Sequence, residues 1–203
     1  TDEERQKYFY SVRKEYNSYR IGEKELSIKR AVEFIFLNRT CFNGLYRVNK
    51  NGEFNVPCGK YKNPTICDSK NLRNLSFLIR NVEFQYGDYK KSEKYVDSNT
   101  FVYFDPPYRP LSITSGFTSY TKEDFNDENQ KELANYFKEL DEKKAKLMLS
   151  NSNPKNTNKE DNFFEVIYKG FNINEISAKR MINANCKGRG AISELLITNY
   201  EEN

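Results

Sequence analysis

The C-terminal half of this 203-residue chain alternates short apolar runs with a helical pattern, and this alternation constrains the fold most. One apolar run occupies residues 101–104, and another, Leu147-Met148-Leu149, lies within 146–150. Between them, residues 125–144 place four apolar side chains on one helical face: Leu133, Tyr136, Phe137 and Leu140. A strand, a helix and a second strand in this order predict a right-handed crossover between parallel strands. We therefore expect an α/β fold.

Further apolar runs extend this prediction. Residues 82–86 form one that ends in Gly87-Asp88-Tyr89, just as the run at 101–104 ends in Asp105-Pro106-Pro107-Tyr108. Buried parallel strands with functional loops at their carboxyl ends have this appearance. A short helix is expected at 163–168, followed by strands at 171–178 and 195–200 on either side of a basic, glycine-containing loop.

The N-terminal part of the chain is predicted to be helical. We expect a first helix within residues 1–25, with a weak apolar stripe formed by Tyr8, Tyr10, Val12 and Tyr16. A second helix over 26–38 carries five residues at the spacing of one buried face: Ile28, Ala31, Val32, Ile35 and Phe36. Residues 45–48 and 54–56 then flank Asn51-Gly52, a pair that tolerates positive φ, and predict a projecting basic β-hairpin.

Composition removes several classes of mechanism. The chain contains no His, so Ser/His/Asp triads, Cys/His pairs and His-ligated metals are excluded. Its four Cys residues form no CxxC pair, so we expect free thiols in a reducing compartment. No run approaches the ~18 apolar residues of a membrane span and no signal segment opens the chain, which predicts a soluble, cytoplasmic protein. With a net charge of only +4, any nucleic-acid binding is expected to use a localised basic face.

The segment Asp105-Pro106-Pro107-Tyr108 is the strongest chemical signal. The exocyclic amine of a nucleobase is a poor nucleophile, because its lone pair is delocalised into the ring. The Asp105 carboxylate and the Pro106 carbonyl can each accept one N–H of such an amine, which favours a tetrahedral nitrogen in line with an electrophilic methyl group. Tyr108 offers a face on which a base stacks, and the two prolines stiffen the loop. The alternative is a rigid turn that merely ends a strand.

With these residues, the chain resembles the Dam-type adenine-N6 DNA methyltransferases. The resemblance includes the Asp-Pro-Pro-Tyr motif, residues 42–49, residues 52–61, Leu111-Ser112, Phe117-Thr118-Ser119-Tyr120 and Leu149-Ser150-Asn151. These segments occur in family order from near residue 7 to the C-terminus. Within this family, the chain resembles solitary Dam enzymes and restriction–modification methylases that modify GATC.

The resemblance implies a Rossmann-like sheet that binds S-adenosylmethionine (SAM) without a metal, together with a target-recognition domain of helices and a β-hairpin. Residues 1–75 would form the target-recognition domain and residues 76–203 the C-terminal part of the catalytic domain. The catalytic group would be Asp105, Pro106, Pro107 and Tyr108. Asp105 would contact both the target adenine and the methionine part of SAM. Asp88 and Tyr89 would hold the adenosine part, or else form an ordinary strand-ending turn.

By the same resemblance, the hairpin region would bind double-stranded DNA while the adenine flips out of the duplex. Arg47 would read a guanine through O6 and N7, and Pro57 would pack on a thymine methyl. Phe42 and Asn43 would enter the duplex. The remaining contacts expected near the hairpin are Asn49, Lys60 and Tyr61, and the basic, glycine-containing loop at 187–190 adds Lys187 and Arg189 as expected phosphate contacts. The alternatives are a solvated basic turn for the hairpin group and a flexible connector for the loop of Lys187 and Arg189.

Part of the family pattern has no counterpart in this sequence. The only Gly-x-Gly is Gly188-Arg189-Gly190, which is too late and too basic to serve as the Phe-x-Gly-x-Gly turn that holds SAM. The chain therefore resembles the C-terminal portion of such an enzyme, and we expect it to bind SAM weakly unless the remaining segment is supplied. A cognate restriction endonuclease system would be a further partner. Alternative functions are DNA binding without catalysis and methyl transfer to an amine in RNA.

Overall fold

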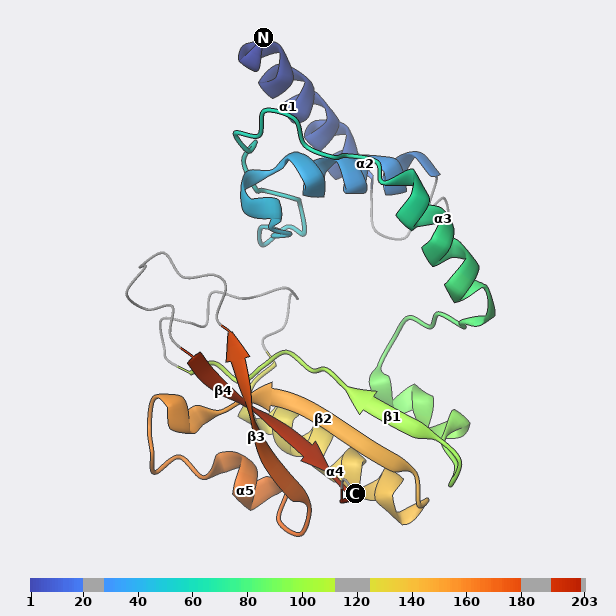
Figure 1. The fold of residues 1–203 in the computed structure, drawn as a ribbon, viewed down its shortest axis with the longest axis vertical. Helices are drawn as coiled ribbons and strands as arrows, with labels where there is room; N and C mark the ends of the chain where they lie inside the picture. The colour runs from blue at the N-terminus through green and yellow to red at the C-terminus, as the bar shows by residue number, and fades with distance from the viewer. Residues whose placement is uncertain (20–27, 112–124, 180–190, 202–203) are drawn as a thin grey trace. The chain divides into compact units, whose positions relative to one another are not determined.

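The computed structural model describes residues 1–19, 28–111, 125–179 and 191–201 (Figure 1). The chain divides into two compact units, one formed mainly by Thr1–Gln85 and the other beginning at Tyr86. Each unit has its own hydrophobic core. Among the helices in the described ranges, none is long and apolar enough to cross a membrane.

Two helices and a hairpin form most of the first unit. Helix α1 (Asp2–Ser18) begins at Thr1, whose side chain and the Glu4 side chain each accept a hydrogen bond from the other's backbone N–H. This capping box satisfies N–H groups that have no partner inside the helix, and the acidic first turn complements the helix dipole. Helix α2 (Ile28–Thr40) packs against α1. The buried core of this unit comprises Phe9, Val12, Leu37, Cys41, Phe54 and Val56.

Helix α1 follows its predicted stripe only in part. Val12 is buried as expected and Tyr16 packs against the core, but Tyr8 and Tyr10 are exposed and Phe9 is buried in their place. The tyrosines did not predict the buried face of α1, because a tyrosine side chain can stay at the surface with its hydroxyl in water. Phe9 has no polar group and is buried.

The predicted buried face of α2 is confirmed only in part, at Phe36, which packs against the core. Ile28 is 85% exposed and Val32 is 58% exposed, whereas Glu33 and Leu37 are buried. Apolar residues lie on several sides of α2, so their spacing alone does not choose a face. The choice depends on α1 and the hairpin, which pack on the side of Leu37.

The β-hairpin predicted around Asn51-Gly52 is confirmed. Val48 and Phe54 form an antiparallel bridge, and the Asn49 N–H donates to the Glu53 carbonyl at 2.9 Å. The Gly52 N–H donates to the Asn49 carbonyl at 2.9 Å, and Gly52 has a φ of +79°. Positive φ is used at Gly52 alone, so the connection is a turn followed by a left-handed glycine rather than a turn with two such residues.

Helix α3 (Ser69–Leu78) and a short 3₁₀ helix (Ile79–Asn81) follow the hairpin. The strand predicted at 82–86 is wrong, because the structure has no strand in this described segment. Val82, Phe84 and Tyr86 are 51%, 74% and 103% exposed. A strand needs a hydrogen-bonded neighbour, and no described strand pairs with these residues, so their apolar character is not sufficient.

The second unit is built on a mixed sheet, which has four strands in the described residues. Its elements are β1 (Phe101–Phe104), α4 (Asp127–Glu142), β2 (Lys146–Ser152), α5 (Phe163–Ile167), β3 (Asn172–Lys179) and β4 (Ala191–Thr198), with 3₁₀ helices at Tyr89–Tyr95 and Pro154–Asn156. The strand order is β1-β2-β4-β3 (Figure 1). Strands β1 and β2 are parallel, and the other neighbours are antiparallel. The α/β class and the parallel pair joined through α4 are confirmed.

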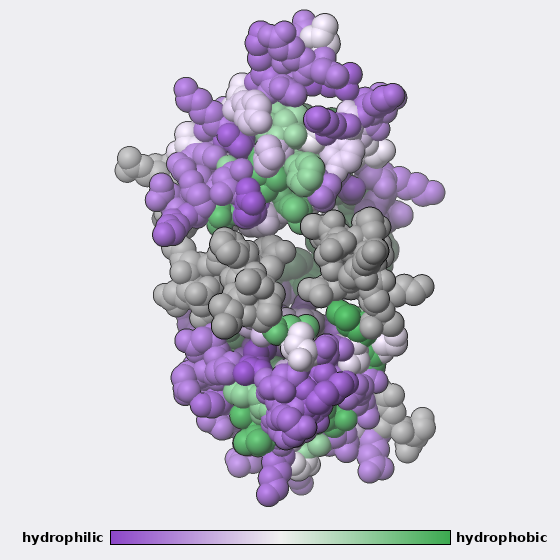
Figure 2. Space-filling model, turned by 90° about the vertical axis from the view of Figure 1, so that its left-hand side faces the viewer, coloured by the Kyte–Doolittle hydropathy of each residue, from purple (hydrophilic) through white to green (hydrophobic). Residues whose placement is uncertain are grey.

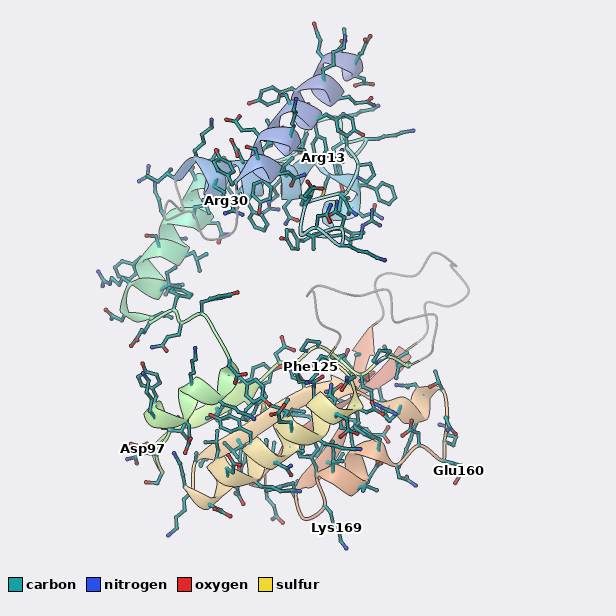
Figure 3. The ribbon with its side chains drawn as sticks, turned by 180° about the vertical axis from the view of Figure 1, so that it is seen from behind. Arg13, Arg30, Asp97, Phe125, Glu160 and Lys169 are labelled. Carbon is teal, nitrogen blue, oxygen red and sulfur yellow. The ribbon has the colours of Figure 1, made fainter. Side chains whose placement is uncertain are left out.

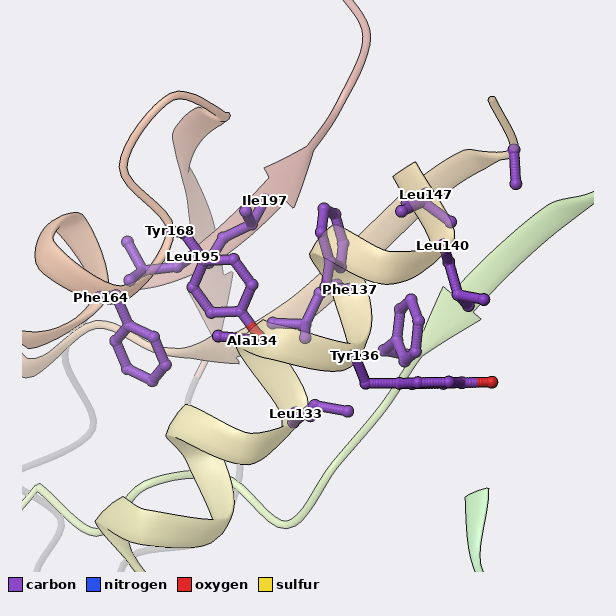
Figure 4. Packing of buried hydrophobic residues seen from close by; sticks show 13 residues of the cluster. Leu133, Ala134, Tyr136, Phe137, Leu140, Leu147, Phe164, Tyr168, Leu195 and Ile197 are labelled. Atoms are coloured by element: carbon purple, nitrogen blue, oxygen red, sulfur yellow. The ribbon is translucent and has the colours of Figure 1, made fainter. Parts of the chain in front are cut away.

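Helix α4 lies along one face of this sheet and supplies much of the core (Figure 3). Its predicted apolar face is confirmed, because Leu133, Tyr136, Phe137 and Leu140 are all buried. They pack with residues of the neighbouring strands and of α5 and its C-cap (Figure 4): Leu147, Phe164, Tyr168, Leu195 and Ile197. Leu149 belongs to the same cluster.

The opposite face of β1 has a different character. Phe101 and Tyr103 are 55% and 53% exposed, although β1 was expected to be buried on both faces. Val102 and Phe104 point to the α4 core, so among the described residues only one face of β1 is covered. Figure 2 shows apolar side chains at the surface of both units, among mainly hydrophilic ones.

Candidate functional site

The candidate catalytic loop leaves the sheet at the carboxyl ends of its two parallel strands. Phe104 of β1 pairs with Leu149 of β2, so Asp105 follows β1 beside Ser150. The Ser150 hydroxyl donates a long hydrogen bond of 3.4 Å to Asp105 Oδ1 and lies 2.8 Å from the Tyr103 hydroxyl. Asp105 itself is exposed, so its carboxylate keeps acceptor positions for a ligand.

Tyr108 stands at the other end of this loop. It is 37% exposed, and its hydroxyl donates to Glu194 Oε2 at 3.4 Å. Burial raises the pKa of Tyr108, so the phenol is neutral at physiological pH. Pro106 and Pro107 have no N–H to offer, and the Pro107 carbonyl accepts a hydrogen bond from Gln130 Nε2 at 3.0 Å. The loop therefore presents a carboxylate and an aromatic ring on a backbone that is tied to α4.

Asp88 and Tyr89, the expected contacts for adenosine, also belong to the second unit. Asp88 caps the 3₁₀ helix Tyr89–Tyr95, because its Oδ1 accepts from the Lys90 N–H at 2.9 Å. The Tyr89 ring lies 5.3 Å from that of Tyr136, which also contacts Phe104, the residue before Asp105. The Tyr89 hydroxyl is buried without a hydrogen-bond partner among the described residues, and burial raises its pKa. Their role toward SAM stays a prediction.

Arg109, for which the sequence predicted no role, anchors the chain directly after Tyr108. Its guanidinium forms two hydrogen bonds with the Asp127 carboxylate, at 2.7 and 3.0 Å, and one with Asp161 at 2.7 Å. It also lies over the Phe163 ring, 4.3 Å from the ring centre. The hydrogen bonds to Asp127 raise the pKa of Arg109 most, and the hydrogen bond to Asp161 raises it further. Its position next to the motif was the only sequence signal, because its partners come from distant segments.

The hairpin brings together several of the expected DNA contacts of the first unit. Arg47 is exposed, and its Nε donates to Asn55 Oδ1 at 2.8 Å, which orients the guanidinium. The Asn49 side chain is used within the turn, where its Oδ1 accepts from the N–H groups of Asn51 and Glu53 at 2.9 and 3.0 Å. Arg47 is therefore the better placed of the two for an outside ligand.

The 3₁₀ turn Phe42–Gly44 lies against the second arm of the hairpin. The Phe42 N–H donates to the Pro57 carbonyl at 2.9 Å, which places these two expected contacts side by side. Phe42 is 52% exposed and Asn43 has a φ of +55°, so this turn carries its residues outward in a conformation that Asn tolerates.

Lys60 and Tyr61 are exposed just beyond Gly59. A Cβ on Gly59 would lie 2.8 Å from the Cys41 carbonyl and 2.6 Å from the Tyr61 ring, so only glycine allows this approach. Tyr61 and Asn43 together line a surface pocket of about 540 Å³. The remaining two expected contacts, Lys187 and Arg189, lie outside the described residues.

Comparison with known proteins gives one consistent family. The family model of the D12 class N6 adenine-specific DNA methyltransferases matches residues 1–182. The chain is 53% identical over 202 residues to the type II methyltransferase M.MjaIII of Methanocaldococcus jannaschii, which covers 98% of this chain and 66% of the relative. It is 42% identical over 200 residues to the type II methyltransferase M1.LlaDCHI of Lactococcus lactis subsp. cremoris, covering 98% of this chain and 68% of the relative.

A third similar protein is the DNA adenine methylase of Escherichia coli K12, at 34% identity over 188 residues, with 93% of this chain and 63% of the relative covered. The chain thus spans about two thirds of the length of these relatives. Because the family model covers most of the sequence, the assignment does not depend on the Asp-Pro-Pro-Tyr motif alone. This chain belongs to the D12 class N6 adenine-specific DNA methyltransferase family.

Proposed function

We propose that the full gene product carrying this chain is a cytoplasmic enzyme that transfers a methyl group from SAM to adenine N6 in double-stranded DNA. The observation that carries the proposal is the exposed Asp105 carboxylate at the end of β1, on the same short loop as the half-exposed ring of Tyr108. Family membership supports the same reaction. We also propose that the sheet of the full gene product is Rossmann-like.

The loop suits an adenine that has left the duplex. Asp105 and the Pro106 carbonyl each accept one N–H of the target amine, which draws the nitrogen lone pair out of conjugation with the ring. The flipped base stacks on Tyr108. Since no imidazole exists in this chain, acceptor geometry and orientation carry the chemistry.

The residues around the loop fit a SAM molecule in part. The Asp105 carboxylate suits its ammonium group, and Asp88 retains a second carboxylate oxygen beside the one that caps the 3₁₀ helix. The Tyr89 hydroxyl, which is buried without a partner in the part of the chain that the structure describes, is a further hydrogen-bonding group that SAM could use. When bound, SAM supplies the electrophilic methyl group. The glycine-rich turn of the family is not among these residues, so we propose weak SAM binding by the chain alone.

The first unit supplies the proposed recognition of the target, for which we propose GATC. Among the described residues, Asn55 accepts from the Nε of Arg47, and both terminal nitrogens are proposed to bind guanine O6 and N7. Phe42 and Asn43 fill the space of the flipped adenine, and Pro57 packs on a thymine methyl. Asn49, Lys60, Tyr61, Lys187 and Arg189 are proposed as further contacts with bases or phosphates. Residues 1–75 and 76–203 remain our proposed recognition and catalytic domains.

Two of the similar proteins are named type II methyltransferases. This supports the proposal that the enzyme acts beside a cognate restriction endonuclease that cuts the same site.

Tritiated SAM tests the function. The full gene product is incubated with duplexes that contain GATC, with duplexes in which the four bases are permuted, and with RNA of the same sequence. Incorporation into the GATC duplex alone is expected. Incorporation into RNA would show that the substrate is RNA and not DNA. DNA binding without incorporation into any substrate would identify a non-catalytic DNA-binding protein.

A further inference from the structure

Two buried amide side chains hold the backbone on both sides of Tyr108. Gln130 of α4 and Asn151 of β2 are both 0% exposed. They are bonded to each other, since Asn151 Nδ2 donates to Gln130 Oε1 at 3.2 Å. Gln130 lies one turn before Leu133 and Ala134, on the face of α4 that is otherwise apolar. A polar group at such a position costs stability unless it is hydrogen-bonded, so its partners explain its presence.

Those partners are in the candidate catalytic loop. Gln130 Nε2 donates to the Pro107 carbonyl at 3.0 Å, immediately before Tyr108. Asn151 Oδ1 accepts from the Arg109 N–H at 2.9 Å, immediately after Tyr108. Ser152 Oγ adds a bond of 2.6 Å to the Arg109 carbonyl.

The chemistry of proline explains why a side-chain donor is needed. Pro106 and Pro107 have no N–H, so this part of the loop can be fastened only through its carbonyl groups. A carbonyl requires a donor, and the amide of Gln130 can donate to Pro107 while accepting from Asn151. An apolar residue or a carboxylate at position 130 cannot do both at neutral pH.

We propose that Gln130 and Asn151 are positioning residues, which fix the ring of Tyr108 relative to the Asp105 carboxylate so that a flipped adenine meets both at once. This inference rests on the proposed methyl transfer. Reacting groups lose large factors in rate when they are displaced by about 1 Å, so the loop needs anchors on both sides of its aromatic residue.

Steady-state methylation by the full gene product tests the proposal, with Gln130→Met as the main variant. Methionine has a similar length and cannot donate. We expect kcat to fall roughly 10- to 100-fold while KM for SAM changes by less than about threefold. In a duplex with 2-aminopurine at the target adenine, we expect brighter fluorescence from the variant, because the flipped base no longer stacks stably on Tyr108.

Gln130→Glu provides rescue by a conservative variant. Burial raises the pKa of a carboxyl group at this position, and the protonated form can donate to Pro107 and accept from Asn151. Its kcat, relative to that of Gln130→Met, should therefore rise as the pH is lowered from 8 to 6. A merely structural role of Gln130 predicts that only the stability recovers at lower pH, while kcat per folded enzyme is the same in both variants.

Asn199→Leu is the matched control. Asn199 also joins α4 to β2 through its amide, with bonds of 2.6 Å to Asp141 and 2.8 Å to the Leu147 N–H, but at the other end of the strand. Loss of this amide should lower stability without changing kcat.

Equal kcat in wild type and Gln130→Met, or a fall of kcat in Asn199→Leu equal to that in Gln130→Met, would overturn the proposal. If Gln130→Met does not fold, the less buried Ser152→Ala variant is expected to lower kcat in the same way, and an unchanged kcat there overturns it. Absence of methylation by the wild type would instead reject the proposed function.

Discussion

Removal of the Arg109 guanidinium should destabilise the second unit measurably. Arg109 is 20% exposed and Asp161 is 24% exposed, so their pair lies between a surface ion pair and a buried one. Asp127, at 48% exposed, is screened more strongly by water. Exposed pairs contribute about 0–1 kcal/mol, whereas breaking a buried pair costs about 3–5 kcal/mol. We expect Arg109→Met to cost about 2 kcal/mol.

The loss of stability in Arg109→Met should become smaller as the pH falls. Burial alone would raise the pKa of Asp161, but hydrogen bonds from Arg109 and the Phe163 N–H bring it below its ordinary value. A carboxylate with a lowered pKa stabilises the folded state fully above its unfolded pKa of about 3.9, and this contribution disappears as the pH falls through the folded pKa. The difference between wild type and Arg109→Met should therefore be constant near neutrality and shrink below about pH 4.

Native-state hydrogen exchange of the β2 and β4 amides measures the free energy of opening of the unit that contains Arg109. Lys131→Met is the control, because Lys131 on α4 pairs with Glu128 in the open, at 49% and 78% exposure. It should change the free energy of opening by less than about 0.5 kcal/mol. A loss in Arg109→Met no larger than in this control, or one that persists unchanged at low pH, would refute the reasoning.

Two further variants test the site residues. Arg47→Ala should reduce discrimination at the guanine of the target by about 1–3 kcal/mol, which competition between GATC and a duplex with that base pair changed will measure; equal discrimination by both proteins contradicts the assignment. Tyr108→Ala should weaken stacking of the flipped base by about 1–3 kcal/mol, whereas Tyr108→Phe keeps the ring and should methylate at nearly the wild-type rate. Rate measurements on both variants decide this, and a comparable loss in Tyr108→Phe would show that the hydroxyl bonded to Glu194, rather than the ring, is required.

The spacing of apolar residues was enough to predict α4, which is buried on one face only. The face of α4 with Leu133 and Phe137 is apolar and the rest of the helix is polar, so only one face could be buried. Helix α2 offers no such contrast, and its buried face follows from where α1 and the hairpin pack. Residues 82–86 failed as a strand for a related reason, since strand formation depends on a neighbour that an apolar run does not specify.

The site shows the same division between local and tertiary information. Asp105 to Tyr108 could be identified from the sequence because four adjacent residues contain the chemical groups of the proposed reaction. Gln130 could have been noticed as a polar residue on the apolar face of α4, one turn before Leu133. Its hydrogen bond to Pro107 could not, because it joins segments 23 residues apart in the sequence.

The identity of the methylated base in the presence and absence of the Asp105 carboxylate tests the central claim most directly. The full gene product and its Asp105→Asn variant are each incubated with SAM and a GATC duplex, and the nucleosides are separated and identified by mass spectrometry. We expect N6-methyladenine from the wild type and a loss of at least about 100-fold in Asp105→Asn, with binding of the duplex retained. Methylation of another base, or N6-methyladenine at an undiminished rate in Asp105→Asn, would contradict the account.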